Sequence, residues 1–270
     1  MTENLFSKIF IFFINKVHRL KQKMSRSKCL ASDVMLVSYP KSGVSYLSFL
    51  IANIYELAIS QKSNVKINYY NVDEYVADIH SPTFTGNTIM TTRIIKTHEN
   101  AVQFRDRTNT NLRGTYCRMI FVERNVEEAL YSYFLYQNAL DKNLGYKIDK
   151  FFKYLEGRGR SQPFWDETWD KYKTEMGKGF ISVRYEDLLS KPIEVLQLVC
   201  DFIGWEVEEK IINTAVKNCS REVLSKLEAD YGDGVIYDSD YSFSSKSSDT
   251  QVEGKEEIRK EIARRVKVNA

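Results

Sequence analysis

The 270-residue sequence contains little cysteine, and its four cysteines lie far apart. No two of them form a CxxC pair or another spacing typical of metal ligands, so a metal site held by cysteines is not indicated. Cys117 and Cys200 lie beside or within apolar segments and are typical of reduced thiols in a core. We therefore expect a protein of the cytoplasm, where thiols stay reduced, and we expect no bound metal.

A long apolar run is also missing from the sequence. The unbroken run Ile9–Ile14 is far too short to span a bilayer, and no signal-peptide cleavage pattern follows it. Apolar residues recur around this run at helical spacing, with Lys and Arg between them. Residues 1–28 are predicted to be a basic amphipathic helix that packs on the domain or lies in solvent. Binding to an anionic membrane surface is the alternative that we do not expect.

The net charge of the chain is low, at +3, and it is unevenly distributed. Residues 1–28 carry seven Lys or Arg and one Glu, a balance of +6, so the rest of the chain has a balance of −3. This distribution argues against a nucleic-acid-binding protein, whose positive surface should belong to the folded domain. With 43% hydrophobic and 28% charged residues, positions 29–270 are predicted to form one globular domain.

The Walker A spacing GxxxxGK[ST] of ordinary ATPases and GTPases is absent as well. A different strand–turn–helix pattern is present instead. The apolar run Val34–Val37 is followed by the turn Tyr39–Gly43, after which apolar residues resume at helical spacing from Leu47 to Ala58. Such a P-loop-like turn directs backbone N–H groups and the positive end of a helix at one point, which suits a bound phosphate.

Three further short apolar runs, at 93–98, 119–122 and 180–183, are predicted to be strands, and helical patterns separate them. Among these, 141–175 is expected to form surface helices around Trp165 and Trp169, and 253–267 a final helix. Residues 61–90 and 231–248 are expected to be connections. This order predicts a single α/β domain with a mainly parallel central sheet and helices on both faces.

Ligands of such folds bind at the carboxyl ends of the strands. Four separate segments place cationic or polar side chains there: Lys41, Lys96 with His98, Arg124, and Tyr185. Their common location predicts one site for an anionic ligand.

The turn itself, Tyr39–Leu47 with the sequence YPKSGVSYL, resembles the YPKSGTTWL loop of sulfotransferases that use 3′-phosphoadenosine 5′-phosphosulfate (PAPS). Further segments resemble this family in the expected order. Ile95–His98 is similar to its IKTH segment, Val122–Asn125 with Ser132 to its R-N-P…S element, and Tyr185–Leu188 to YEDL. Gln162–Trp165 also resembles a family segment, so the resemblance covers about residues 34–205.

The resemblance implies a set of PAPS-binding residues. Arg124 and Ser132 would bind the 3′-phosphate, and Tyr185 would line the adenine site. The loop would hold the 5′-phosphosulfate through Lys41, Ser42, Gly43, Val44, Ser45 and Tyr46.

The resemblance implies a catalytic role for His98, and the charge of the sulfuryl donor suggests roles for Lys41 and Lys96. His98 would be the catalytic base, because its unperturbed pKa range suits accepting a proton from a hydroxyl or amine near neutral pH. Lys41 would donate to the leaving oxygen, and Lys96 would steady the sulfuryl oxygens. Each has a simpler alternative role: a hydrogen-bonded structural histidine or a solvated lysine.

The sequence departs from the family at the adenine site and near its C-terminus. Tyr46 stands where the family usually has a stacking Trp. In Asn218–Leu224, which resembles the TSF..M stretch of the family and contains Cys219, Arg221 replaces the second stacking aromatic residue. The RKGxxGxW loop is reduced to a segment around Lys246, which is assigned as a contact of the 3′-phosphate.

We therefore expect a cytoplasmic sulfotransferase that transfers a sulfuryl group from PAPS to a hydroxyl or to an amine or amide nitrogen of a small molecule. The first alternative is a binding protein with the same fold that holds an anionic nucleotide without turnover. The second is a nucleotide kinase, which the missing Walker A spacing disfavours. The sequence does not name the acceptor, and the dimer motif of the family is not visible.

Overall fold

The computed structural model describes residue 30 and residues 32–60, 66–79, 89–108, 117–176, 179–231 and 254–268. The predicted amphipathic segment 1–28, Lys246 and all of the expected 231–248 connection except Tyr231 lie outside the described residues. Within the described part, no helix is both long enough and apolar enough to cross a membrane.

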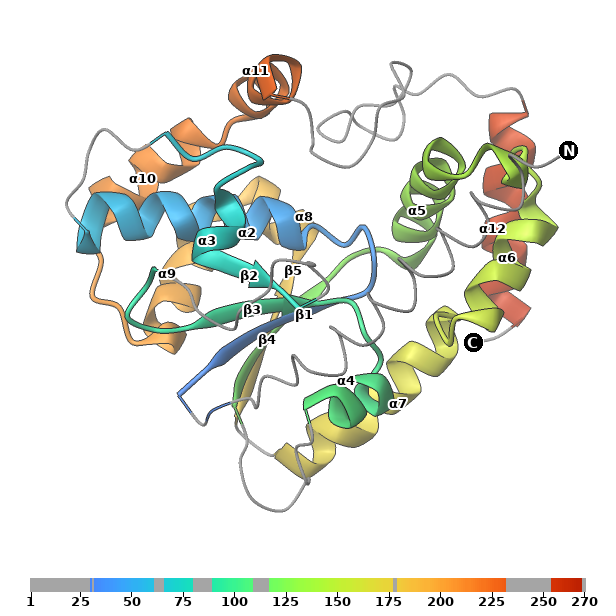
Figure 1. Ribbon diagram of the computed structural model, residues 1–270, viewed down its shortest axis with the longest axis horizontal. Coiled ribbons are helices and arrows are strands. Elements are labelled where there is room, and N and C mark those ends of the chain that lie inside the picture. Colours follow the sequence, from blue (N-terminus) through green and yellow to red (C-terminus); the bar gives the residue numbers. More distant parts are fainter. Residues whose placement is uncertain are drawn as a thin grey trace, which may run out of the picture.

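The centre of the fold is a parallel sheet of five strands in the order β2-β3-β1-β4-β5 (Figure 1). In chain order the strands are Val34–Ser38 (β1), Val76–Asp78 (β2), Ile94–Thr97 (β3), Arg118–Glu123 (β4) and Phe180–Arg184 (β5). The four predicted strands are confirmed within a residue or two at their ends. β2 was not predicted, because its three residues are too short to show a pattern within the polar stretch 61–90.

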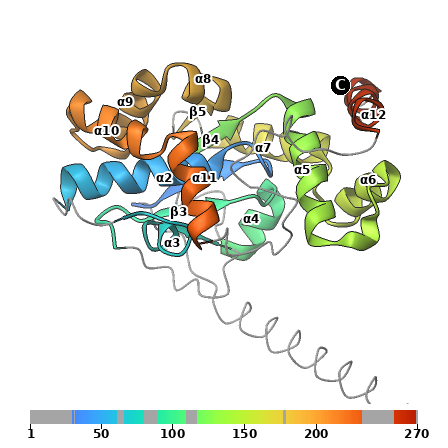
Figure 2. The same cartoon turned by 90° about the horizontal axis from the view of Figure 1, so that it is seen from above.

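The helices of the described part follow the strands as the sequence pattern indicates, on both faces of the sheet (Figure 2). The helices are α2 (Val44–Ile54), which continues into the π-helical turn η1 (Tyr55–Ile59), α3 (Val72–Tyr75), α4 (Ala101–Thr108), α5 (Val126–Leu140), the 3₁₀ turn η2 (Lys142–Leu144), α6 (Ile148–Gly157), α7 (Gln162–Met176), α8 (Tyr185–Ser190), α9 (Pro192–Ile203), α10 (Glu209–Asn218), α11 (Arg221–Tyr231) and α12 (Lys255–Val268).

Local sequence explains where several helices begin and end. The side chain of Asn125 accepts a hydrogen bond from the Glu128 backbone N–H at 3.1 Å and so caps the start of α5. Pro192 occupies the first turn of α9, and Gly204 ends that helix in the left-handed conformation at φ 89°.

Each face of the sheet has its own apolar core. Val34 and Leu36 face the core that contains α2, α9 and α10, whereas Met35 and Val37 face the core that contains α5, α6 and α7. The expectation of surface helices around the tryptophans was wrong in one respect: Trp169 is fully buried in this second core. It packs edge-on against Phe121 of β4, because α7 covers this face of the parallel sheet.

Candidate functional site

The turn between β1 and α2 has a backbone that requires glycine. Lys41 and Gly43 both have positive φ, 67° and 98°, and Gly43 directly precedes the first residue of α2. A Cβ added to Gly43 would collide with the ring of Tyr185, whose Cε2 atom would lie 2.8 Å away. Gly43 thus allows the strained turn and also lets the Tyr185 ring approach the backbone at the start of α2.

Arg124, after β4, links this turn to Tyr185. Its Nη1 donates to the Lys41 carbonyl oxygen at 2.9 Å, and its guanidinium lies 4.8 Å from the centre of the Tyr185 ring. It also lies 4.0 Å from the Glu128 carboxylate, one turn into α5. The structure therefore brings together the residues predicted at the carboxyl ends of β1, β4 and β5, with a cation held over an aromatic face.

The predicted phosphate loop contributes further residues around this point. Ser42 and Val44 are buried, while Lys41, Gly43 and Ser45 are half-buried. The Lys41 ammonium lies 4.6 Å from the centre of the Tyr136 ring on α5, so its side chain extends from the turn toward that helix. Ser132 is half-buried on the same helix, one turn before Tyr136.

The residues predicted for the adenine site gather beside α2. Burial, together with the nearby Cys219 and Tyr185, raises the pKa of Tyr46 to about 12. Cys219 is fully buried at the end of α10, where its Sγ accepts a hydrogen bond from Asn53 of α2 at 3.2 Å. Arg221 begins α11 two residues later.

His98 follows β3 and contacts the end of β1. Its Nδ1 lies 3.0 Å from the Ser38 carbonyl oxygen and 3.1 Å from the Ser38 hydroxyl. A carbonyl oxygen can only accept, so the ring proton belongs on Nδ1 and the lone pair on Nε2. Burial lowers the pKa of His98 from its ordinary value of 6.5, and the positive charges of Arg160 and Lys96 lower it further, while Ser38 and Asp78 oppose the shift. The imidazole is therefore neutral near pH 7 and can accept a proton at Nε2.

Lys96 lies within β3, and its ammonium is occupied by carboxylates. Its Nζ is 2.8 Å from Asp73 of α3 and 3.9 Å from Asp78 at the end of β2. The sequence did not reveal either partner, because both lie in the stretch 61–90 that was expected to be a connection. A role at a sulfuryl group would require this lysine to share its charge with Asp73.

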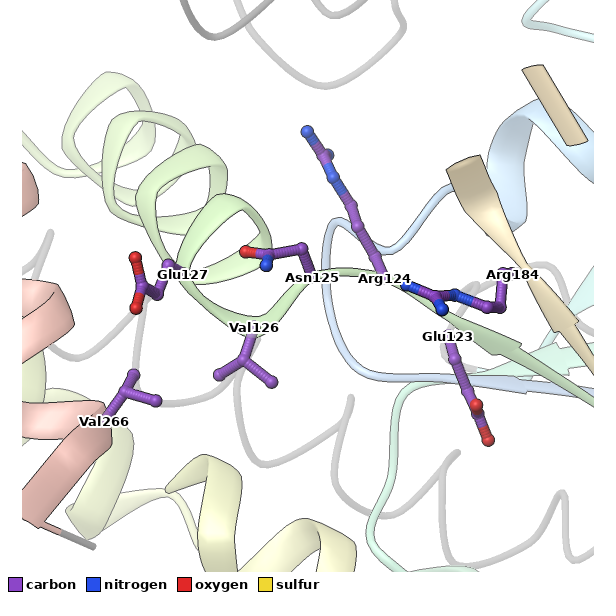
Figure 3. Close-up of a pocket in the computed structure, with 7 residues that line it drawn as sticks. All are labelled: Glu123, Arg124, Asn125, Val126, Glu127, Arg184 and Val266. Atoms are coloured by element: carbon purple, nitrogen blue, oxygen red, sulfur yellow. The ribbon is translucent and has the colours of Figure 1, made fainter. Parts of the chain in front are cut away.

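A surface hollow of about 410 Å³ lies beside this cluster and is drawn in Figure 3. It is lined by Glu123, Arg124, Asn125, Val126, Glu127, Arg184 and Val266. Its lining includes neither Lys41 nor His98, and Figure 3 shows the head of Arg124 directed away from the other lining side chains. The hollow therefore belongs to the outer end of β4. The candidate site is instead the region between the β1–α2 turn, the Tyr185 ring and the His98 imidazole.

Sequence reasoning missed one part of the site, the turn between α6 and α7, which packs against the residues that follow β3. Asn100 Nδ2 donates to the Gly159 carbonyl oxygen at 2.9 Å, and Trp165 Nε1 donates to the His98 carbonyl oxygen at 3.3 Å. Tyr39 of the phosphate loop donates its hydroxyl to the Arg160 carbonyl oxygen at 2.9 Å. In the sequence, only the resemblance of Gln162–Trp165 to a family segment indicated that this turn belongs to the site.

Strand order and loop geometry define a parallel α/β protein with a P-loop-like turn at the carboxyl edge of its sheet, where Arg124 contacts the backbone of Lys41. Among the described residues, no group of three or more His, Cys, Asp or Glu is placed to hold a metal ion. The chain belongs to the sulfotransferase family, since the model of the sulfotransferase domain matches residues 31–267.

Curated relatives agree with this assignment. Cytosolic sulfotransferase 12 of Arabidopsis thaliana is 25% identical over 213 residues, which cover 73% of this chain and 64% of the relative. Flavonol 3-sulfotransferase of Flaveria bidentis is 23% identical over 225 residues, which cover 74% of this chain and 67% of that enzyme. The match thus spans less than two thirds of the length of the first of these relatives.

Solved structures share the fold. Mouse sulfotransferase SULT7A1 complexed with PAP matches with a TM-score of 0.57 and 18% identity, over 87% of this chain and 84% of that one. Retinol dehydratase in complex with androsterone and the inactive cofactor PAP matches with a TM-score of 0.56 and 16% identity, over 89% and 81% of the two chains. At this identity the likeness concerns the arrangement of helices and strands.

Proposed function

We propose that the protein is a PAPS-dependent sulfotransferase that sulfates a hydroxyl or an amine or amide nitrogen of a small molecule. The observation that carries the proposal is the convergence of Gly43, Arg124 and Tyr185 on one turn, across from His98. PAPS is a multiply charged anion, and this turn offers it a helix N-terminus, cations and an aromatic face. The family to which the chain belongs supports the same conclusion.

In the proposed reaction, His98 serves the acceptor. The acceptor oxygen or nitrogen forms a bond to sulfur, the bond from sulfur to the phosphate oxygen breaks, and the acceptor proton passes to Nε2 of His98. The contact of Nδ1 with the Ser38 carbonyl supports this role, because it leaves the Nε2 lone pair as the basic position.

Lys41 serves the leaving phosphate in this scheme, and the rest of the turn binds it. The backbone N–H groups at the start of α2 and the Lys41 ammonium would neutralise the charge that develops as the sulfuryl group departs. Arg124 and Ser132 are proposed to bind the 3′-phosphate. Tyr46, Tyr185, Cys219 and Arg221 are proposed to surround the adenine, and Lys246 to reach the 3′-phosphate from outside the described residues.

Lys96 is proposed to contact the sulfuryl oxygens after it exchanges its carboxylate partner. Its pairing with Asp73 at 2.8 Å competes with any contact to a sulfuryl oxygen. Lys96 lies two residues before His98 at the carboxyl edge of the sheet. If its ammonium left Asp73 for the bound ligand, it would bring a positive charge next to the sulfuryl group.

The acceptor class and the compartment are proposed from the relatives. Their names include a flavonol sulfotransferase and cytosolic sulfotransferases, and a structural neighbour holds androsterone. We propose a small organic acceptor and a cytoplasmic location, with residues 29–270 as the catalytic domain and 1–28 as a separate segment.

The test of the nucleotide site compares 3′,5′-ADP, which is PAPS without its sulfuryl group, with 5′-AMP. Because Arg124 is assigned to the 3′-phosphate, 3′,5′-ADP should raise the melting temperature more than 5′-AMP does at the same concentration. Arg124→Ala should remove most of this difference, since a hydrogen bond to a charged group contributes about 1.5–3 kcal/mol. Equal shifts in the parent protein would contradict the proposed function.

Turnover separates an enzyme from a binding protein. Incubation with PAPS and a panel of phenols, alcohols and amines, read by mass spectrometry, should yield a sulfated product. Tight binding of 3′,5′-ADP without any product across the panel would favour the non-catalytic alternative.

A further inference from the structure

Arg160 lies in the turn between α6 and α7, and this turn is fastened to the segment around His98. Asn100 Nδ2 donates to the Gly159 carbonyl at 2.9 Å, and Gln103 Nε2 donates to the Arg158 carbonyl at 3.1 Å. Gly159 has a φ of 61°, a left-handed conformation that allows the chain to reverse here. The turn therefore has a fixed position beside the proposed catalytic base.

The guanidinium of Arg160 faces tyrosines. Its Nη1 donates to the Tyr133 hydroxyl at 2.9 Å, while the hydroxyl of Tyr39 donates to the Arg160 carbonyl. The ring of Tyr39 lies edge-on to Tyr133 and to Trp165, at centroid distances of 6.2 and 5.8 Å. One side of this half-buried cation is thus an aromatic wall shared with the phosphate loop.

Two other partly buried arginines carry carboxylate partners, whereas Arg118 donates to the backbone carbonyls of Phe202 and Ile203. Arg93 pairs with Asp33 and Arg259 with Glu128, each at 2.5 Å. Within the described ranges, no carboxylate lies within 4.0 Å of the Arg160 guanidinium. The carboxylate of Asp166 accepts a hydrogen bond from Gln162. Burial and Asp170 raise the pKa of Asp166 to about 6 against the opposing charge of Lys173, and Arg160 is not among the charges that shift it.

A guanidinium has five N–H donors, and a neutral hydroxyl satisfies few of them. Removing such a charge from water without a partner is costly, so a half-buried arginine of this kind is suited to an anion that arrives from outside. This turn lies beside His98, because Asn100 donates to the Gly159 carbonyl oxygen and Trp165 donates to the His98 carbonyl oxygen. Burial lowers the pKa of His98, and the charge of Arg160 adds to that shift. A molecule whose reacting atom lies at His98 can therefore extend toward the Arg160 turn.

We propose that Arg160 binds an anionic group of the acceptor, so that the substrate is an acid, with a carboxylate or a similar anion at one end and the sulfated atom at the other. This inference rests on the proposed function and adds the charge of the acceptor to it. Tyr39, Tyr133 and Trp165 are buried in the second core and would hold Arg160 in position.

The experiment uses the full chain saturated with 3′,5′-ADP and three acid probes, para-hydroxybenzoate, para-hydroxyphenylacetate and para-hydroxyphenylpropanoate, each compared with its methyl ester. Affinities come from the concentration dependence of the melting temperature. At least one acid should bind about 10- to 100-fold more tightly than its ester, as expected for one charged hydrogen-bonded pair. Arg160→Gln should abolish this preference, and Arg160→Lys should retain part of it.

Arg158→Gln is the matched control, because Arg158 is an exposed arginine of the same turn whose guanidinium lies 5.2 Å from the Tyr154 ring. It should keep the preference for the acid. Equal affinities of acid and ester in the parent, or no binding of any probe, would overturn the proposal, as would an unchanged preference in Arg160→Gln. A loss of 3′,5′-ADP binding in Arg160→Gln, with an unchanged melting temperature of the free protein, would assign Arg160 to the nucleotide instead and also overturn it.

The shift caused by 3′,5′-ADP alone, measured beside these probes, separates the two hypotheses. If this shift is absent in the parent, the proposed function fails. If it is present while acids and esters bind equally, only the assignment of Arg160 fails.

Discussion

The two sides of the candidate site are built in different ways. The nucleotide side consists of a strand, a turn and a helix that are contiguous in sequence, together with Arg124 and Tyr185 at the ends of two neighbouring strands. The acceptor side depends on contacts between segments some 60 residues apart, such as Asn100 with Gly159 and Trp165 with His98. The first side follows from a local motif, whereas the second exists only once the helices pack over the sheet.

This difference predicts that substitutions on the two sides will separate binding from turnover. The largest effect is expected for His98→Ala, which should lower turnover about 10²- to 10⁴-fold, the usual contribution of a general base. Its affinity for 3′,5′-ADP should stay nearly unchanged. Lys41→Ala should weaken both, because its charge meets the anion in the ground state and in the transition state. Single-turnover rates with the identified acceptor provide the measurement, and parental turnover in His98→Ala would place the base elsewhere.

Gly43→Ala tests the local construction of the nucleotide side. A side chain at φ 98° is strained, and the added Cβ would force the Tyr185 ring away from the turn. Affinity for 3′,5′-ADP, measured by calorimetry, should fall by about tenfold or more for a strain of about 1–2 kcal/mol per residue. Gly145→Ala is the control, because Gly145 also has positive φ, at 58°, but has open space around its Cβ position. Equal losses of affinity in both variants would mean that the position of the Tyr185 ring does not affect the binding of 3′,5′-ADP.

The pH dependence of turnover tests whether the two sides interact. Because burial and the charge of Arg160 lower the pKa of His98, the base stays unprotonated to a pH below 6.5. The acid limb of kcat/KM should therefore have its midpoint below that value. Arg160→Gln removes a neighbouring cation and should move this midpoint to higher pH. A midpoint above 6.5 in the parent would show that His98 is not the titrating base.

The smallest effect is expected for Asp166→Asn, on the acceptor side. Burial and the neighbouring Asp170 raise the pKa of Asp166 from 3.8 to about 6, so its ionised form is disfavoured in the folded state. A group with a raised pKa favours folding below the unfolded value and loses that contribution as the pH rises through about 6. The Asn variant should be more stable by about 1 kcal/mol at about pH 8, after a discount for partial exposure, and should show no gain at about pH 4. Urea denaturation at the two pH values measures the difference, and a gain of the same size at both would contradict the assigned cause.

The sequence predicted the parts of the fold that depend on local pattern. The four strands were confirmed, because an apolar run acts within a few positions. The cap at Asn125 and the end of α9 at Gly204 likewise depend on residues close in sequence. The contacts of Lys96 were not predicted, since Asp73 and Asp78 belong to short elements in a polar stretch. Arg160 was missed for a similar reason: no local pattern tells which side chains will surround an arginine in a turn between helices.

The central position of β1 has a consequence for how the chain folds. β1 pairs with β3 on one side and with β4 on the other, and both partners come later in the chain. Parallel neighbours cannot form from hairpins, so each pairing must wait for a crossover to be completed. During synthesis β1 remains unpaired on one edge until residue 123 has left the ribosome. Until then, its apolar residues and open hydrogen-bonding edge are exposed to other chains, and the first half of the protein is the part most in need of a chaperone.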